Sequence, residues 1–188
     1  MPESSAAVFL DRDGTLIEEK VYLSNPTGVV VFPGVGAALR GLMDAGLKLV
    51  VVTNQSGIGR GYYTEADMRR VNQRLLEELS AERVRFEKIY FAPEAPGQPS
   101  RGRKPLPQFL FDARDEFGID LAGSFMVGDK RADLECGWNA GVRQSILVRT
   151  GYGAELEPGL GSDAGRTVVV DGMTAAAEWI LHSVQSAS

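Results

Sequence analysis

Residues 6–15 read AAVFLDRDGT, so a short apolar run passes directly into two aspartates that are separated by one residue. The run 6–10 has the length and composition of a buried parallel strand. In sheets of parallel strands, ligands bind beyond the carboxyl ends of the strands. Asp11 and Asp13 are therefore expected at the edge of the sheet where functional groups gather.

Further apolar runs of the same kind recur along the chain. They are LKLVVV (47–52), FEKIYFA (86–92), SFMVG (124–128), SILV (145–148) and TVVV (167–170). Segments with helical spacing separate them, beginning with a helix opened by a capping box of Thr64 and Asp67. Other helices are predicted over 105–117, with Pro105 at its first position and Gly118 as its stop, over 131–140 and over 173–184. This alternation predicts an α/β fold with a doubly wound, mostly parallel sheet.

Two long stretches interrupt the alternation, at 12–34 and at 93–104, and 150–165 is expected to be a further loop. Long irregular loops usually carry function or are mobile. Because no repeat or linker divides the chain, residues 1–188 are expected to form one domain.

The charge pattern limits the possible partners. The chain has a net charge of −5 and no block of like charges, which argues against nucleic acid or an anionic membrane as the main partner. The single Cys136 forms no internal disulfide, and no basic leader or membrane-length apolar run is present. We expect a cytoplasmic monomer that binds neither nucleic acid nor membrane.

Polar residues also follow three other predicted strands. They are Thr53 and Asn54, Lys104, and Asp129. With the two aspartates after the first strand, they supply three carboxylates, a hydroxyl and an ammonium. Phosphoryl transfer needs such a set, because the protein must position a nucleophile and neutralise charge on the phosphoryl oxygens.

Each of these groups has a chemical role in such a reaction. Asp11 can attack phosphorus to form an aspartyl-phosphate, and Asp13 can protonate the leaving oxygen and later accept a proton from water. Asp11 and Asp129, with a backbone oxygen and waters, suit Mg²⁺. Thr53 and Lys104 would hold the transferring phosphoryl group.

Structural interpretations compete with these roles. The Asp-Gly pair after the first strand is typical of a turn, and Thr53 with Asn54 is compatible with a cap or turn. Lys104 alone could be a solvated surface lysine, and Asp129 and Asp133 could only favour the start of the following helix. The joint placement at four strand ends favours the functional interpretation.

The stretches DRDGT, VVVTNQSGIGRG, RGRKPLP and MVGDKRADLECGWNAG resemble, in order and spacing, the four motifs of the haloacid dehalogenase (HAD) superfamily of Mg²⁺ phosphohydrolases. The chain is too short for a separate cap domain, so it resembles the capless branch. The resemblance implies a Rossmann-like HAD fold with Asp11 as nucleophile and Asp13 as acid/base. It also implies a Mg²⁺ site of Asp11, Asp13 and Asp129, with Thr53 and Lys104 as phosphoryl clamps.

Within that branch, TNQSGIGRGYYTEAD resembles the heptose 1,7-bisphosphate phosphatases through Ser56 and the pair Arg60 and Gly61. Histidinol phosphatases tend toward an acidic residue at the Ser56 position. The resemblance implies removal of the 7-phosphate in nucleotide-heptose synthesis for a bacterial lipopolysaccharide. Two alternatives stay open, namely another small phosphomonoester such as histidinol phosphate, and a non-catalytic phosphate-binding module.

The resemblance also implies a set of substrate contacts. They are Glu19, Lys20, Val21, Tyr22, Asn54, Gln55, Ser56, Arg103 and Lys130. Arg103 has a physical case of its own, because a planar guanidinium grips a second phosphate with two hydrogen bonds.

One part of the chain departs from the family pattern. Related enzymes carry a zinc loop patterned C-x-H and then C-x-C, whereas the matching residues here are Ala92, Glu94, Ser100 and Gly102. None of these is a thiolate or an imidazole, so no structural zinc is expected.

Overall fold

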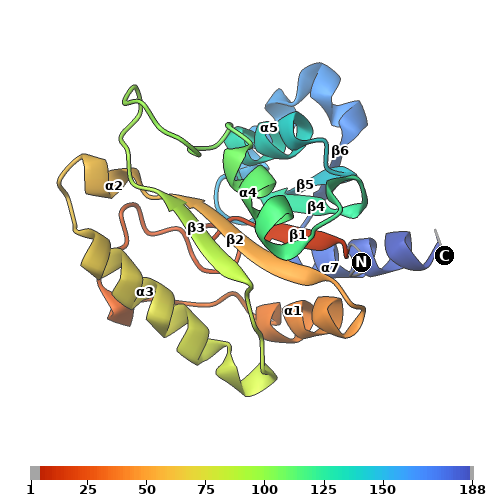
Figure 1. Cartoon of the computed structure of the whole chain (residues 1–188), viewed down its shortest axis with the longest axis horizontal. Helices are drawn as coiled ribbons and strands as arrows, with labels where there is room; N and C mark the ends of the chain where they lie inside the picture. Colours follow the sequence, from red (N-terminus) through yellow and green to blue (C-terminus); the bar gives the residue numbers. More distant parts are fainter. Residues whose placement is uncertain (1–4, 187–188) are drawn as a thin grey trace.

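Six parallel strands form one sheet in the computed structural model, which describes residues 5–186 (Figure 1). Their order is β3-β2-β1-β4-β5-β6, so the strand that precedes the two aspartates lies inside the sheet. The strands are β1 (Ala7–Leu10), β2 (Lys48–Asn54), β3 (Lys88–Ala92), β4 (Phe125–Gly128), β5 (Gln144–Val148) and β6 (Thr167–Val170). Phe9 pairs with Val50 on one side and with Met126 on the other. The predicted parallel sheet is confirmed, and a strand lies in each predicted run.

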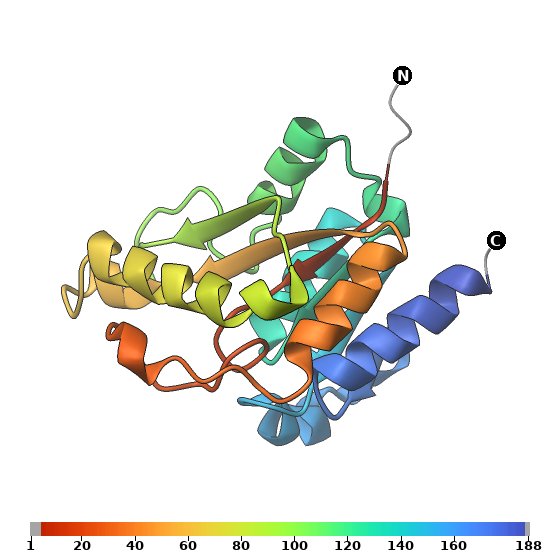
Figure 2. The ribbon, with the colours of Figure 1, turned by 90° about the horizontal axis from the view of Figure 1, so that it is seen from below.

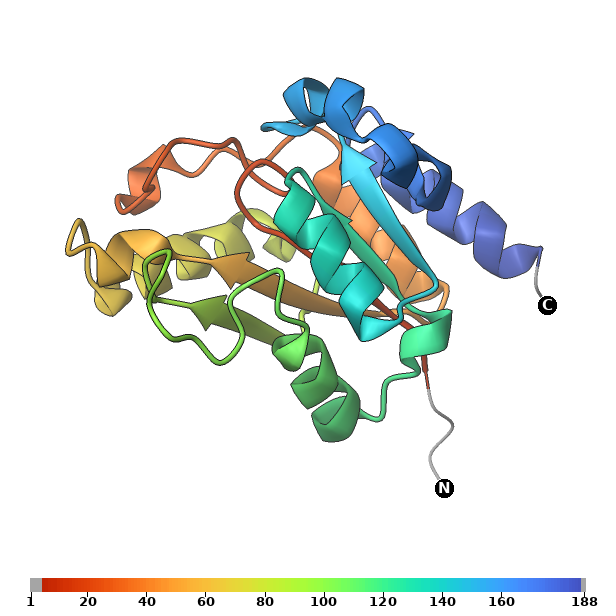
Figure 3. The same cartoon turned by 90° about the horizontal axis from the view of Figure 1, so that it is seen from above.

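Helices cover both faces of the sheet. On one face lie α1 (Val35–Asp44), α3 (Glu65–Glu78) and α7 (Met173–Gln185), as Figure 2 shows. On the other face lie α4 (Gln108–Phe117) and α5 (Arg131–Ala140), which Figure 3 shows. Val8 and Leu10 pack into the first core and Phe9 packs into the second. Strands covered on both faces are apolar at most positions, and for this reason nearly continuous apolar runs identify them.

Local sequence signals set several helix ends. Thr64 Oγ1 accepts a hydrogen bond from the Asp67 amide and the Asp67 carboxylate accepts one from the Thr64 amide, so the predicted capping box opens α3. Helix α5 begins and ends at the predicted residues. Gly118 has a φ of 65° and ends α4, as expected for a left-handed C-cap.

The start of α4 was predicted wrongly. The helix begins at Gln108, with Pro107 as its N-cap, and Pro105 lies before it. Leu106 stands directly before Pro107, and a residue in that position is disfavoured in helical geometry because the proline ring clashes with its backbone. The segment before Pro107 is therefore free to run toward the sheet edge, and it carries Lys104 there.

Other helical segments were not predicted from the sequence. Helix α1 and the short α2 (Ser56–Gly59) were not identified. The expected loop 150–165 contains α6 (Gly153–Leu156) and two short turns, η4 (Glu157–Gly159) and η5 (Gly161–Arg166). The stretch 12–34 is irregular as predicted, except for the turn η1 (Pro26–Gly28). No helix within residues 5–186 combines the length and the apolar character needed to cross a membrane.

Candidate active site

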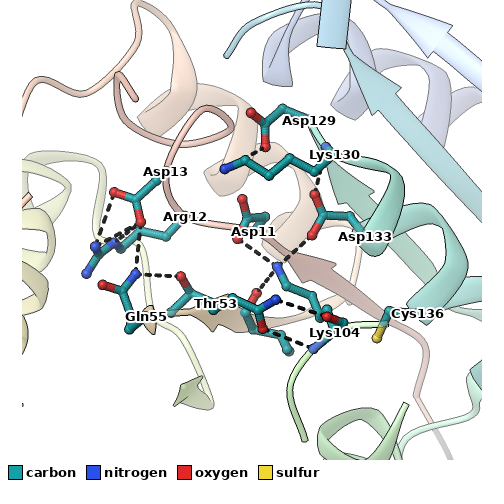
Figure 4. A network of polar contacts seen from close by, with 12 residues as sticks. Asp11, Arg12, Asp13, Thr53, Gln55, Lys104, Asp129, Lys130, Asp133 and Cys136 are labelled. Carbon is teal, nitrogen blue, oxygen red and sulfur yellow. Dashed lines mark hydrogen bonds and ion pairs between the residues drawn. The ribbon is translucent and has the colours of Figure 1, made fainter. Parts of the chain in front are cut away.

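The carboxyl ends of three neighbouring strands bring the predicted functional residues together. Asp11 follows β1, Thr53 lies near the end of β2, and Asp129 follows β4. The loop after β3 adds Lys104, and Figure 4 shows these side chains converging. Asp11, Asp13, Thr53 and Lys104 line a pocket with a volume of about 210 Å³ at this edge of the sheet.

Lys104 is buried and bridges two carboxylates. Its Nζ donates to Asp11 Oδ1 at 2.7 Å and to the main-chain oxygen of Val52 at 2.6 Å, and it lies 2.6 Å from Asp133 Oδ1. Burial opposes its charge, but the carboxylates of Asp11 and Asp133 outweigh this and raise the pKa of Lys104. The ammonium therefore stays charged in a site shielded from water.

Asp11 is also kept ionised. Burial disfavours the carboxylate of Asp11, but the positive charges of Lys104 and Lys130 lower the pKa of Asp11 below its ordinary value. Asp11 is 4% exposed and its amide donates to the main-chain oxygen of Val127 at 2.9 Å. The side chain is thus charged, nearly dry and held by its backbone.

A cluster of carboxylates beside Lys104 has the properties of a cation site. Asp11, Asp129 and Asp133 each offer one oxygen within 4.8 Å of the others. Burial, together with the charges of Asp11 and Asp133, raises the pKa of Asp129 to about 8. Asp129 Oδ1 is buried and accepts no hydrogen bond from residues 5–186. The nearest cation is the ammonium of Lys130, 3.8 Å from this oxygen. A hard cation would relieve the repulsion and give Asp129 Oδ1 a close partner, so the donor set fits Mg²⁺.

Two glycines set the position of Asp129. Gly14 has a φ of 85° and Gly151 a φ of 59°, a region that favours glycine. A Cβ on either residue would overlap Asp129 Oδ2. The Tyr152 amide donates to the same oxygen at 2.9 Å. The loop after β5 thus closes around a residue supplied by β4.

The side chain of Asp13 lies apart from the carboxylate cluster. Its Oδ2 accepts from Arg12 Nε at 3.0 Å and from Gln55 Nε2 at 2.9 Å, and its Oδ1 accepts from Arg12 Nη2 at 3.1 Å. Figure 4 shows this group on the opposite side of Asp11 from Lys104. The structure therefore groups Asp133, rather than the side chain of Asp13, with Asp11 and Asp129.

The other predicted contact residues fall into two groups. The pocket is lined by Glu19, Val21, Tyr22, Asn54, Gln55, Ser56 and Lys130. Lys20 and Arg103 do not line it. Lys20 is exposed with its Nζ 3.5 Å from Glu18, and Arg103 is half-buried in the loop that follows β3. Seven of the nine predicted substrate contacts therefore line the pocket, and two do not.

Two residues of the pocket wall are bonded to other protein groups. Asn54 Oδ1 accepts from the Lys104 amide at 3.0 Å, and Asn54 Nδ2 donates to the Lys104 oxygen at 3.1 Å. Gln55 Nε2 donates to Thr53 Oγ1 at 2.8 Å as well as to Asp13. The side-chain amides of Asn54 and Gln55 therefore orient Lys104 and Asp13.

The loop 93–104 is held by its own side chains. Ser100 Oγ donates to the Glu94 carboxylate at 2.7 Å and accepts from the Arg103 amide at 3.0 Å. Arg103 Nη1 donates to the Glu94 main-chain oxygen at 3.1 Å. Glu94 and Ser100, which the resemblance aligns with zinc ligands, are hydrogen-bonded to each other. These residues do not fit a zinc ion.

Several residues at the site were given no catalytic or binding role from the sequence. Arg12 and Asp133 are buried at 0% and 1% exposure, and each pairs with a predicted catalytic residue. Tyr63 Oη donates to Gln55 Oε1 at 2.7 Å. A signal existed for Arg12, because a charged residue between a buried strand and a glycine turn needs a buried partner. For Asp133 and Tyr63 the decisive contacts arise only in the folded chain.

Comparison with known families places these motifs in context. The model of a family described as HAD-hydrolase-like matches residues 102–176. The D-glycero-beta-D-manno-heptose-1,7-bisphosphate 7-phosphatase of Yersinia pestis is 36% identical over 191 residues, covering 98% of this chain and 94% of the relative. The enzyme of the same name from Escherichia coli K12 is 40% identical over 158 residues, covering 80% and 83%.

Solved structures agree with the sequence relatives. The D,D-heptose 1,7-bisphosphate phosphatase from B. bronchiseptica, complexed with magnesium and phosphate, superposes with a TM-score of 0.85 at 29% identity, covering 95% of this chain and 99% of that one. The corresponding phosphatase from Burkholderia thailandensis has a TM-score of 0.68 at 30% identity, covering 94% and 99%. The likeness thus extends over nearly the whole described chain.

Proposed function

Because the chain belongs to the HAD-like hydrolase family that includes the heptose 1,7-bisphosphate 7-phosphatases, we propose that it removes the 7-phosphate of D-glycero-D-manno-heptose 1,7-bisphosphate. It is accordingly a phosphatase, a phosphoric monoester hydrolase of the HAD type. The observation that carries the proposal is the buried Lys104, which holds Asp11 beside the carboxylates of Asp129 and Asp133. The proposed reaction belongs to nucleotide-heptose synthesis for bacterial lipopolysaccharide.

In the first step, Asp11 attacks phosphorus and the bond to the sugar oxygen breaks. Asp11 suits this role because it is ionised and nearly dry, which leaves its oxygen poorly solvated and reactive. Lys104 and Thr53 hold the phosphoryl oxygens in place. The product of this step is an aspartyl-phosphate on Asp11 together with the free sugar hydroxyl.

Asp13 moves the protons in both steps. Two donors hold its Oδ2, whereas Oδ1 has one longer contact, so Oδ1 is the oxygen that we propose to exchange a proton. It gives this proton to the departing sugar oxygen. In the second step, Asp13 takes a proton from water, whose oxygen attacks phosphorus and releases phosphate from Asp11.

Mg²⁺ is the proposed cofactor. Asp11 and Asp129 would hold it through carboxylate oxygens and Asp13 through its main-chain oxygen, as Mg²⁺ prefers few protein ligands. When bound, the ion supplies positive charge that neutralises the phosphoryl oxygens. Asp133 forms an ion pair with Lys104, so its proposed role is to position Lys104. Asp133 also accepts a hydrogen bond from the Lys130 amide at 2.9 Å.

The sugar and its second phosphate are proposed to lie over the outer part of the pocket. Contacts there come from Glu19, Val21, Tyr22, Ser56 and Lys130. Arg103 is proposed to recognise the second phosphate from the loop after β3. Burial and the positive charge of Arg60 lower the pKa of Arg103, so two guanidinium groups lie near each other on this side of the site.

A phosphate-release assay tests the proposed function. We expect kcat/KM for the heptose bisphosphate, with Mg²⁺ present, to exceed that for histidinol phosphate at least about 100-fold, since each missing charged contact costs roughly tenfold or more. Product analysis should show release from C7 alone, and a chelator should abolish turnover until Mg²⁺ is restored. A preference for histidinol phosphate would contradict the proposed substrate, and metal-free turnover would contradict the mechanism.

We also propose that the loop 93–104 binds no zinc. Purified protein is expected to contain less than about a tenth of an equivalent of zinc, because Glu94 and Ser100 cannot replace thiolates. Chelation should lower Tm by no more than about a few degrees, since no structural metal is lost. Elemental analysis checks the first statement and thermal unfolding the second. Zinc that stays stoichiometric after dialysis would overturn the proposal.

A further inference from the structure

A chain of hydrogen bonds through the buried Arg12 leads from the pocket into helix α3. Arg12 directs Nε and Nη2 at Asp13, while its Nη1 donates to Asn72 Oδ1 at 2.7 Å. The guanidinium is fully buried, so it is held by these partners and not by solvent. Because the guanidinium is planar, fixing Nη1 also fixes the direction of the two donors that hold Asp13.

Asn72 is an unusual residue for its place. It lies in the buried stripe of α3 with Met68, Val71 and Leu75. Asparagine is a weaker helix former than leucine, and a buried amide is costly unless it is bonded. Its Nδ2 donates to Met68 Sδ at 3.0 Å, which turns Oδ1 toward Arg12. A polar residue that breaks an apolar stripe in this way indicates a role beyond packing.

Asn72 itself does not line the pocket. Its link to the pocket is Arg12, which lines the pocket and holds Asp13. Oδ2 of Asp13 also accepts from Gln55, which in turn accepts from Tyr63. Asp13 thus accepts from two side chains, Arg12 and Gln55. Tyr63 holds Gln55 in place, and Asn72 holds Arg12 in place.

We propose that Asn72 is a positioning residue for the acid/base step, which it serves by holding Arg12 against Asp13. The inference rests on the proposed role of Asp13 as the group that protonates the leaving oxygen. With Asn72 in place, Arg12 holds both oxygens of the Asp13 carboxylate and so keeps it in one direction. Without it, the guanidinium can rotate, and the carboxylate loses its fixed direction.

The test compares two leaving groups. A sugar alkoxide needs a proton to depart, whereas para-nitrophenolate departs without one. The ratio kcat/KM covers only the steps through aspartyl-phosphate formation, so it isolates the effect of protonation. We expect Asn72→Leu to lower kcat/KM for a sugar phosphate about 10-fold and that for para-nitrophenyl phosphate less than about 3-fold, since small misplacements of a catalytic group cost rates of this order.

Matched variants make the result specific. Asn72→Asp keeps an acceptor oxygen for Arg12 and should restore most of the lost kcat/KM. Gln73→Leu makes a comparable change at the next residue of α3, which is exposed and bonded to Glu77, and should leave both substrates unaffected. If Asn72→Leu does not fold, Arg12→Lys tests the same contact, because lysine keeps the charge but cannot hold Asn72 and Asp13 together.

Asp13→Asn, measured alongside, separates the two hypotheses. If Asp13→Asn shows no difference between the leaving groups, the proposed acid/base role fails. Suppose that Asp13→Asn lowers kcat/KM more for the sugar phosphate than for para-nitrophenyl phosphate. If Asn72→Leu then lowers kcat/KM equally for both substrates, or for neither, the positioning role of Asn72 is overturned. An Asn72→Asp variant as impaired as Asn72→Leu would overturn it as well.

Discussion

Asp11→Asn is expected to abolish turnover, with kcat lower by more than about 1,000-fold, because a neutral amide cannot attack phosphorus. The variant should stay folded. Lys104 keeps Asp133 as a counter-ion, and the substitution removes a negative charge from the crowded carboxyl groups of Asp11, Asp129 and Asp133. Phosphate release with Mg²⁺ and thermal unfolding check the two statements. Asp44→Asn, the same substitution at an exposed site on α1, should leave both quantities unchanged.

The stereochemistry at phosphorus decides whether Asp11 acts as a nucleophile. Two in-line displacements, first by Asp11 and then by water, retain the configuration of a substrate made chiral with oxygen isotopes. A single attack by water inverts it. Inversion, or an Asp11→Asn variant with substantial turnover, would remove the aspartyl-phosphate from the mechanism.

Asp13→Asn is expected to lower kcat/KM for a sugar phosphate by about 100-fold to 10,000-fold, the range that a general acid contributes. The loss for para-nitrophenyl phosphate should be much smaller, because that leaving group needs no proton. Binding of Mg²⁺ and of substrate should persist, since the carboxylate of Asp13 lies outside the cluster of Asp11, Asp129 and Asp133. Kinetics with both substrates and calorimetric binding make these measurements.

The folding of Asp13→Asn needs its own measurement. The Arg12 side chain is 1% exposed and loses a charged partner in this variant, which lowers stability. Asparagine keeps one acceptor oxygen, and Asn72 still accepts from Arg12, so a folded protein with reduced Tm is expected. Equal losses on both leaving groups, or loss of binding together with turnover, would contradict the acid role.

The sequence alone predicted the sheet and the placement of its main polar residues. Continuous apolar runs are required where helices cover both faces, so the pattern of β1 or β4 is readable without a structure. Parallel strands end at one edge, and this rule alone puts Asp11, Thr53 and Asp129 together. The capping box of α3 and the left-handed stop of α4 are likewise local signals.

The start of α4 shows where a local signal misled. Pro105 matches the first position of a helix, but Pro107 is the stronger constraint on Leu106. The helix start thus depends on which of the two prolines has the stronger effect, and it decides the path of the segment that carries Lys104. The non-helical segment before Pro107 is what allows Lys104 to reach Asp11.

Only the tertiary structure decided which side chains hold Asp11 and Asp13, the proposed catalytic groups. Arg12 meets Asn72 across 60 residues, Gln55 meets Asp13 across 42, and Lys104 meets Asp11 across 93. Local spacing contains no information about such pairs, because they depend on the strand order and on the paths of the loops between strands. The sequence therefore determined which residues stand at the edge of the sheet, whereas the packing of α3 and of the loops determined which of them touch.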